Sequence, residues 1–328
     1  MLPIVVDAMG GDDAPGPIVA GAHLAAAAGH SVVLVGPADL DCVDAATGAR
    51  LDLIEASEVI GMHDDPAQGV RRKKDSTLVR AAEAVRDGKA SAMISAGNTG
   101  ATMAAALLRM GRISGVKRPA IATPIPIPGS TPTILLDAGA NAEVQADWLV
   151  QFALMGSVYA RHRFGIAEPR VGLLSIGEEP GKGDNLRKET YELLSAAEGL
   201  NFIGNVEGRD VMAKHLDVCV TDGFTGNVVL KTLEGALTVI VAALLEAFNA
   251  EPHYQPHTEA LMPALLGLYR TLSPDTYGGA VLLGVDGVCV ISHGSSTAEA
   301  IVNGIGVAAE MVERDVVSEI RAAIAANA

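Results

Sequence analysis

The sequence predicts a three-layer α/β fold, in which a largely parallel sheet lies between two layers of helices. Five times along the 328 residues, a short aliphatic run ends in a loop of Gly, Asp, Asn or Ser, and a helix-like segment follows. Strands that are buried on both faces of a parallel sheet read as continuous aliphatic runs. The composition agrees, because 49% of the residues are hydrophobic and only 3% are aromatic. We expect a single α/β domain over residues 1–328.

The five strand–loop–helix units span residues 4–12, 93–100, 134–141, 218–227 and 288–296. Ligands of parallel sheets bind outside the carboxyl ends of the strands, so several of these loops are expected to line one crevice. Free backbone N–H groups and helix N-termini there would attract an anion, most naturally phosphate.

Further elements follow from hydrophobic spacing and from turn residues. We expect helices at 17–28 and 142–163, helices that start at 77 and 186, a last helix over 301–320, and strands at 31–35, 51–56, 120–123 and 170–176. Five prolines between residues 119 and 132 exclude a helix there and favour an extended connection. Two apolar helices, 234–248 and 259–272, flank a turn-rich connector, so residues 234–277 read as a helical hairpin that projects from the sheet.

The charge balance restricts the partners. A net charge of −15 argues against nucleic-acid binding, which needs a basic footprint. One basic run stands out, consisting of Arg71, Arg72, Lys73 and Lys74. It is either a solvated face or a surface that recruits an acidic partner.

The cysteines and the chain start indicate the compartment. The three cysteines show no CxxC spacing, which favours buried thiols in a reducing environment. The first residues open on a strand and show no secretion signal. No apolar run reaches the roughly 18 residues that a membrane span requires. We expect a cytoplasmic protein that can still touch a membrane surface.

Several loop residues are candidates for binding an anion, and each also has an ordinary structural explanation. Gly10 and Gly11 would let the backbone approach a ligand closely, or make a tight turn. Asn98, Asn141 and Asn227 are amides at helix starts, where N-capping is the alternative. The repetition of this pattern favours a ligand.

Two other features give weaker indications. Lys182 lies between glycines and can swing onto an anion, although a solvated lysine is the simpler alternative. His293 and Ser295 suggest a nucleophile, yet Ser296 and Glu299 fit a capping box, and there is no GxSxG motif.

Common cofactor motifs are absent from the sequence. It has no GxGxxG loop, no Walker A motif and no HExxH motif. Asp7, Asp137 and Asp222 could hold Mg²⁺, or cap helices and orient loops. We predict neither a metal nor a cofactor.

Eight segments, in order along the chain, resemble bacterial phosphate acyltransferase, also called acyl-ACP:phosphate transacylase. They are residues 6–12, 70–74, 95–101, 136–141, 202–207, 220–228, 277–279 and 293–296. The resemblance implies a fold like that of isocitrate/isopropylmalate dehydrogenases and phosphotransacetylases, a homodimer, and peripheral membrane contact. It also implies conversion of acyl-acyl carrier protein and inorganic phosphate to acyl phosphate. A membrane acyltransferase would then pass the acyl group to glycerol 3-phosphate for phospholipid synthesis.

The resemblance places Lys182 at the family's lysine before a glycine, whereas Asp13 stands where the family usually has histidine. We expect Lys182, Asn227 and Asn98 to be catalytic. Phosphate or substrate contacts are expected from Gly10, Gly11, Asp12, Thr99, Gly100, Asp137, Asn141, Asn185, Lys188, His293, Ser295 and Ser296. The run from Arg71 to Lys74 would steer the acidic carrier protein. Leu261, Leu265 and Leu268 of the hairpin would meet the acyl chain or the bilayer.

Three other functions stay open from the sequence alone. They are an acyl-CoA:phosphate transferase of the phosphotransacetylase type, a metal-dependent dehydrogenase on the same scaffold, and a non-catalytic membrane scaffold or acyl-phosphate carrier. The sequence offers the dehydrogenase no convincing nucleotide or metal site.

Overall fold

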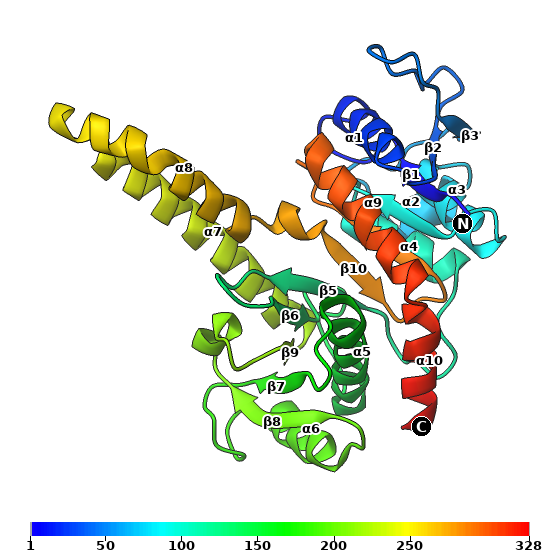
Figure 1. Ribbon diagram of the computed structural model, residues 1–328. Coiled ribbons are helices and arrows are strands. Elements are labelled where there is room, and N and C mark those ends of the chain that lie inside the picture. Colours follow the sequence, from blue (N-terminus) through cyan, green and yellow to red (C-terminus); the bar gives the residue numbers. More distant parts are fainter. Residues whose placement is uncertain (1, 328) are drawn as a thin grey trace.

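A computed structural model describes residues 2–327 as an α/β protein built on one mixed sheet (Figure 1). The strands are β1 (Ile4–Asp7), β2 (Val32–Gly36), β3 (Asp52–Glu55), β4 (Ala92–Ser95), β5 (Ala120–Ile125), β6 (Thr133–Leu136), β7 (Arg170–Leu174), β8 (Asn201–Val206), β9 (Val218–Val220), β10 (Ala280–Leu283) and β11 (Val288–Ile291). The α-helices are α1 (Gly16–Ala27), α2 (Pro66–Arg72), α3 (Thr77–Arg86), α4 (Thr99–Arg109), α5 (Ala146–Phe164), α6 (Asn185–Ala196), α7 (Gly223–Phe248), α8 (Gln255–Leu272), α9 (Ala298–Glu313) and α10 (Val316–Ala326). Short 3₁₀ turns cover Gly208–Met212, Pro252–Tyr254 and Pro274–Tyr277.

The sheet consists of two parallel blocks that run in opposite directions. Its strand order is β3-β2-β1-β4-β11-β10-β5-β6-β9-β7-β8. The first five strands are mutually parallel, and so are the last four. Between the blocks, β10 and β5 pair antiparallel to each other and to their outer neighbours. The predicted α/β class with a largely parallel sheet is therefore confirmed.

Helices cover both faces of the sheet, as the aliphatic strands predict. Along β1, Ile4 and Val6 join one buried cluster, while Val5 joins the other. The first cluster packs against α1, α5, α9 and α10, and the second packs against α2, α3 and α4. Because successive side chains of a strand point to opposite faces, both faces need apolar residues and both need a helical layer.

The proline-rich segment is more regular than predicted. The strand expected at 120–123 continues to Ile125 and passes through Pro124, which pairs with Ile134 of β6. Pairing with β10 ends at Ala122, so β5 has only one neighbouring strand beyond that point. Proline is tolerated there because its missing N–H leaves no ladder bond unmade. The last predicted helix, over 301–320, is instead two helices, α9 and α10. The first begins at Ala298, because Thr297, rather than the Ser296 of the expected capping box, is its N-cap.

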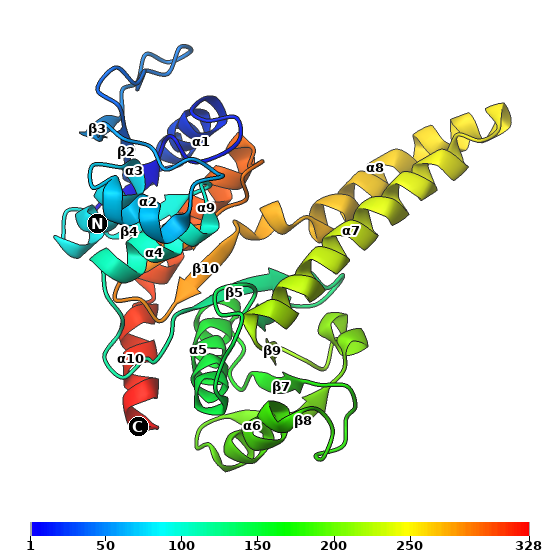
Figure 2. The same cartoon turned by 180° about the vertical axis from the view of Figure 1, so that it is seen from behind.

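The helical hairpin leaves the sheet as two helices that run side by side (Figures 1 and 2). Its first helix, α7, starts earlier than predicted, because Asp222 caps it directly after β9 by accepting from the Thr225 N–H at 2.8 Å. At the far end, the Thr258 hydroxyl donates to the Phe248 carbonyl at 2.8 Å and joins α8 to α7.

The membrane expectation needs correction for α7. In the described part of the chain, this 26-residue helix contains an 18-residue window with a mean hydropathy of 2.0, none of it buried. By length and composition alone, it is long and apolar enough to cross a bilayer. Polar residues such as Thr238 interrupt the apolar sequence of α7 without lowering its mean hydropathy much.

Two glycines of α7 make a matched pair for testing the packing at its first turn. A Cβ on Gly226 would lie 1.9 Å from the carbonyl oxygen of Asp137, whereas a Cβ on Gly235 would meet nothing within 4 Å. We expect Gly226→Ala to lower the free energy of unfolding by about 3 kcal/mol or more, because the backbone must move. Gly235→Ala should raise it by about 0.5–1 kcal/mol, the ordinary gain in a helix. Urea unfolding measures both, and equal effects would contradict the close approach at Gly226.

Candidate active site

The main cleft lies where the loops after five strands meet the first half of α7, and its volume is about 310 Å³. The residues that line it are Asp12, Met62, Gly97, Thr99, Ile121, Thr123, Pro124, Ala138, Asn227, Leu230, Lys231, Glu234, Gly279, Ala280, Ile291, Ser292, His293, Gly294, Ser296 and Ala300. Each of the five strand–loop–helix units contributes at least one residue to this lining. The cleft thus brings together segments that are far apart in the sequence.

The loop after β1 is held against the loop after β4 by a buried carboxylate. The Asp7 side chain accepts a hydrogen bond from the Ser95 hydroxyl at 2.7 Å, and burial raises the pKa of this carboxyl. A Cβ on Gly10 would lie 2.7 Å from the Ser95 oxygen and 2.8 Å from the Gly97 nitrogen. Only glycine fits this approach, so the role of Gly10 visible here is to let the two loops touch.

The neighbouring glycines follow the same pattern. Gly11 has φ +129°, and its Cβ would lie 3.3 Å from the Gly294 carbonyl oxygen, so it fixes the path of the chain toward Asp12. The Asp12 N–H donates to that same Gly294 carbonyl at 2.8 Å and ties the first loop to the last one. Gly100 packs against Pro66 and does not line the cleft.

The side chain of Asn98 holds the loop that contains Met62 and Asp64. Its amide nitrogen donates to the carbonyls of Met62 at 3.0 Å and Asp64 at 3.1 Å. Its amide oxygen accepts from the Ala101 N–H at 3.0 Å and caps α4. Asn98 is buried and does not line the cleft, whereas the next residue, Thr99, does. The geometry makes Asn98 a positioning residue.

Asp137 and Asn141 organise the turn after β6. The buried Asp137 carboxylate accepts from the Ile121 N–H at 3.0 Å and from the Asn141 N–H at 2.7 Å. Burial raises its pKa, and these hydrogen bonds oppose the rise. The Asn141 amide also donates to the Pro119 carbonyl at 2.8 Å. Of this turn, Ala138 lines the cleft.

The loop after β11 supplies polar groups that have no partner. The hydroxyls of Ser292 and Ser296 are buried, with residue exposures of 5% and 7%, and neither has a hydrogen-bond partner within residues 2–327. Burying a hydroxyl without a partner is unfavourable, so both are suited to bond a ligand in the cleft. Beside them, His293 Nδ1 lies 2.8 Å from the exposed Ser295 hydroxyl. The sequence reasoning missed Ser292, whose signal is its place directly after an aliphatic strand.

A second hollow, of about 390 Å³, lies on the other side of the first turn of α7. Thr225 lines this hollow, while Asn227 lines the main cleft. The largely buried Arg187 guanidinium pairs with the Asp222 carboxylate and joins α6 to the start of α7. Burial opposes ionisation of Asp222, but hydrogen bonds from Thr225 and the charge of Arg187 hold its pKa below the usual value.

Lys182, Asn185 and Lys188 lie beside this second hollow and line neither space. All three are exposed. The Lys182 stem packs over Gly177, where a Cβ would lie 2.9 Å from its Cγ. Asn185 and Lys188 belong to the first turn of α6. The structure therefore brings Asn227 into the main cleft and leaves these three residues on the neighbouring loop and helix.

The basic run divides into free and bound cations. Arg71, Arg72 and Lys74 are exposed at the end of α2. Lys73 instead donates to the Val59 carbonyl at 2.6 Å and to the Asp64 carboxylate at 2.7 Å. Three side chains thus remain available to a partner on this surface.

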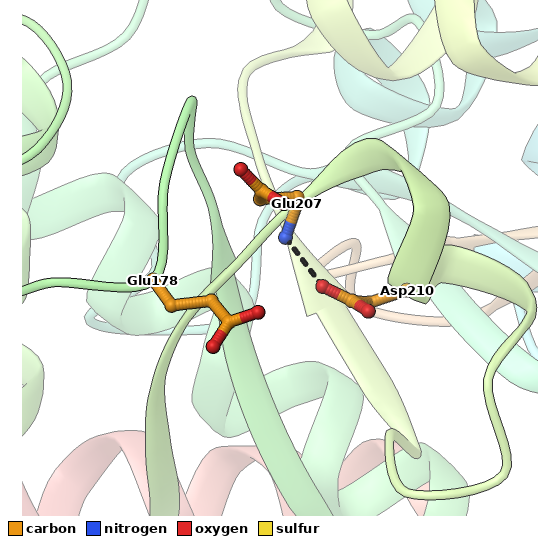
Figure 3. Close-up of side chains that lie close together, drawn as sticks. All are labelled: Glu178, Glu207 and Asp210. Carbon is orange, nitrogen blue, oxygen red and sulfur yellow. Dashed lines mark hydrogen bonds between the residues drawn. The ribbon is translucent and has the colours of Figure 1, made fainter.

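One acidic group outside the lining of the cleft does not fit a metal ion. Glu178, Glu207 and Asp210 lie close together, and Asp210 accepts from the Glu207 N–H at 2.8 Å (Figure 3). They are the only such set of possible ligands in the part of the chain that the structure describes. The Arg209 guanidinium already pairs with Glu178 at 3.1 Å and Glu207 at 2.5 Å. This cation offsets the negative field that a metal would need.

Comparison with known proteins agrees with the resemblance that the sequence motifs indicate. A family model described as fatty acid synthesis protein matches residues 2–319. A phosphate acyltransferase from Pelotomaculum thermopropionicum is 48% identical over 327 residues, covering 98% of this chain and 94% of that protein. One from a Geobacillus species is 44% identical over 326 residues, covering 99% of both. The chain belongs to the phosphate acyltransferase family. It is therefore an acyltransferase enzyme.

Solved structures confirm the fold prediction. A phosphotransacetylase from Streptococcus pyogenes aligns with a TM-score of 0.61 at 17% identity, covering 95% of this chain and 94% of that one. A 4-hydroxythreonine-4-phosphate dehydrogenase from Klebsiella pneumoniae aligns with a TM-score of 0.54 at 15% identity, covering 95% and 100%. At such identities the likeness concerns the fold alone.

The positioning role of Asn98 can be tested by an isosteric change. In Asn98→Asp, a carboxylate would face the carbonyls of Met62 and Asp64 with no proton to donate. We expect the free energy of unfolding to fall by about 1–3 kcal/mol or more, and amide exchange in residues 61–64 to become faster. Asn201→Asp at an exposed position is the control and should change stability by about 0.5 kcal/mol or less. Equal effects of the two substitutions would contradict the role of Asn98.

Proposed function

We propose that this enzyme transfers a fatty acyl group from acyl-acyl carrier protein to inorganic phosphate, giving acyl phosphate and the free carrier thiol. The observation that carries this proposal is the pair of buried, unpartnered hydroxyls of Ser292 and Ser296 in a cleft where α4, α7 and α9 begin. Hydroxyl donors beside helix N-termini suit a phosphate oxyanion.

The chemistry requires positioning more than acid–base catalysis. Phosphate near neutral pH is largely a dianion, and one of its oxygens can attack the thioester carbonyl directly. The new C–O bond forms, the C–S bond breaks, and the carrier leaves as a thiolate, whose model thiol pKa is near 8.5. The enzyme must hold both reactants and stabilise the oxyanion on the carbonyl. Asn227, whose side chain lines the cleft, is the donor we assign to that oxyanion.

The basic residues near the cleft support a carrier protein as the acyl donor. Lys73 ties the basic run to the loop that carries Met62, and Met62 lines the cleft. The exposed Arg71, Arg72 and Lys74 would therefore meet an acidic carrier protein as it delivers its acyl group. The acyl phosphate would then serve a membrane acyltransferase that acts on glycerol 3-phosphate, the start of phospholipid synthesis.

The projecting hairpin supports a peripheral, cytoplasmic enzyme that rests on a membrane surface. Leu261 and Leu268 of α8 are 53% and 47% exposed, and Leu265 between them is partly exposed. Leucines at this spacing share one helix face, which can enter the acyl region of a bilayer or shelter the acyl chain. A homodimer remains part of the proposal, carried by the family resemblance.

The direct test mixes the purified protein with palmitoyl-acyl carrier protein and phosphate, and follows free carrier thiol and acyl phosphate over time. We expect both products to form in equal amounts and only when phosphate is present. Lys182→Ala should lower kcat at least about tenfold if the glycine-flanked loop carries the Lys182 ammonium from beside the second hollow to the reacting anions, as the family resemblance implies. Lys89→Ala, at an exposed lysine in the turn after α3, is the control and should keep wild-type rates.

The outcomes separate the remaining functions. Turnover with palmitoyl-CoA but not with the carrier protein would make the enzyme an acyl-CoA:phosphate transferase. A folded protein that turns over neither donor would overturn the proposal. Unchanged kinetics of Lys182→Ala, with active wild type, would remove Lys182 alone from the site.

Membrane contact is tested with vesicles of phosphatidylglycerol and phosphatidylethanolamine. The double variant Leu261→Glu/Leu268→Glu should bind these vesicles at least about tenfold more weakly in co-sedimentation, because two apolar contacts are replaced by charges. Leu24→Glu on α1 is the matched control, since Leu24 is 55% exposed. Equal binding of all three proteins, or equal losses in both variants, would contradict a membrane-contacting hairpin.

A further inference from the structure

One face of α7 is turned toward the main cleft and carries a cation that the sequence reasoning did not single out. Asn227, Leu230, Lys231 and Glu234 all line the cleft. They are spaced three, four and seven residues apart, which places them on one side of a helix. Among the described residues of the lining, Lys231 is the only lysine or arginine.

Because the charges around Lys231 are negative, an anion needs the positive charge of this lysine to bind in the cleft. The lining also contains the carboxylates of Asp12 and Glu234. The whole chain has a formal net charge of −15, so the surrounding field is negative as well. Without Lys231, a phosphate dianion would enter a cleft with two fixed negative charges and no lysine or arginine to oppose them. Hydroxyl donors alone do not offset such repulsion.

Lys231 is held by a contact that a ligand can replace. Its ammonium lies 2.7 Å from the Glu234 carboxylate, and the two side chains are 51% and 32% exposed. Partly exposed ion pairs of this kind are weak, because water and salt screen them. Exchanging the carboxylate of Glu234 for phosphate oxygens therefore costs little, and a lysine stem is flexible enough to follow the ligand.

We propose that Lys231 binds the attacking inorganic phosphate in the cleft, and that Glu234 competes with phosphate for the Lys231 ammonium group. This inference rests on the proposed phosphate transacylase function and assigns the cation that serves it. In the reaction, a phosphate oxygen forms the bond to the acyl carbon, and the thiolate takes the electrons of the broken C–S bond. Ser292 and Ser296 donate to the same anion.

Because Lys231 pairs with Glu234, substitutions of these two residues should change the KM for phosphate in opposite directions. Lys231→Met should raise the KM for phosphate by on the order of tenfold or more, because a charge-assisted contact is lost. Glu234→Gln should lower it by up to about fivefold, because the competing carboxylate is gone. The KM for palmitoyl-acyl carrier protein should stay within about twofold in both, and Lys231→Arg should recover part of the phosphate affinity. A merely structural role would not move these constants in opposite directions.

The experiment measures initial rates against phosphate concentration at fixed palmitoyl-acyl carrier protein, with Lys89→Met as the matched control and thermal unfolding as a check of folding. Calorimetric titration of each variant with inorganic phosphate alone is run in parallel. A Lys231→Met enzyme whose phosphate KM matches wild type, or a Glu234→Gln enzyme whose KM rises, overturns the inference. If wild type shows no turnover, the transacylase function fails, and the calorimetric comparison of wild type with Lys231→Met still decides whether Lys231 binds phosphate.

Discussion

Buried carboxylates at the ends of β1, β6 and β9 hold the loops on which the cleft depends. Asp7, Asp137 and Asp222 are each buried. Asp7 accepts a hydrogen bond from Ser95 at the end of β4, Asp137 from the loop that follows β6, and Asp222 from the first turn of α7. A buried carboxylate is stable only while such donors surround it. The segments around these carboxyl groups therefore cannot move independently. Moving one of them would remove hydrogen-bond donors from a buried carboxyl group that water does not reach.

This constraint divides the polar residues of the cleft region into two groups. The side-chain amides of Asn98 and Asn141 donate to backbone carbonyls, so these residues hold the loops that form the walls of the cleft. Ser292, Ser296 and Asn227 face the space that the walls enclose, and the two serine hydroxyls there lack partners within the described chain. A fixed frame with a few free donors is the arrangement in which electrostatic preorganisation is effective, because no reorganisation is needed when charge develops.

The sequence predicted the strands and loops around the cleft better than it predicted which polar residues hold these loops and which face the ligand. Aliphatic runs followed by Gly, Asp and Asn loops identified the strands and predicted that their loops line one crevice. They could not distinguish Asn98 from Asn227, since both stand at helix starts. The fate of Asn98 depends on carbonyls of Met62 and Asp64, more than 30 residues away. The sequence could not identify Lys231 either. A lysine on an apolar helix resembles any solvated lysine until the structure shows which residues lie opposite it.

Helix α7 joins the two halves of the proposed activity in one rigid element. Its first turns carry Asn227 and Lys231 to the cleft, and the same helix continues outward to Val239 and Ile240, which are 68% and 55% exposed. A fatty acyl group has a reactive polar end and a long apolar tail, and these ends need different surroundings. One helix that runs from a polar cleft to an exposed apolar surface meets both needs. The helix rises about 1.5 Å per residue, so Asn227 and Val239 lie roughly 18 Å apart along it.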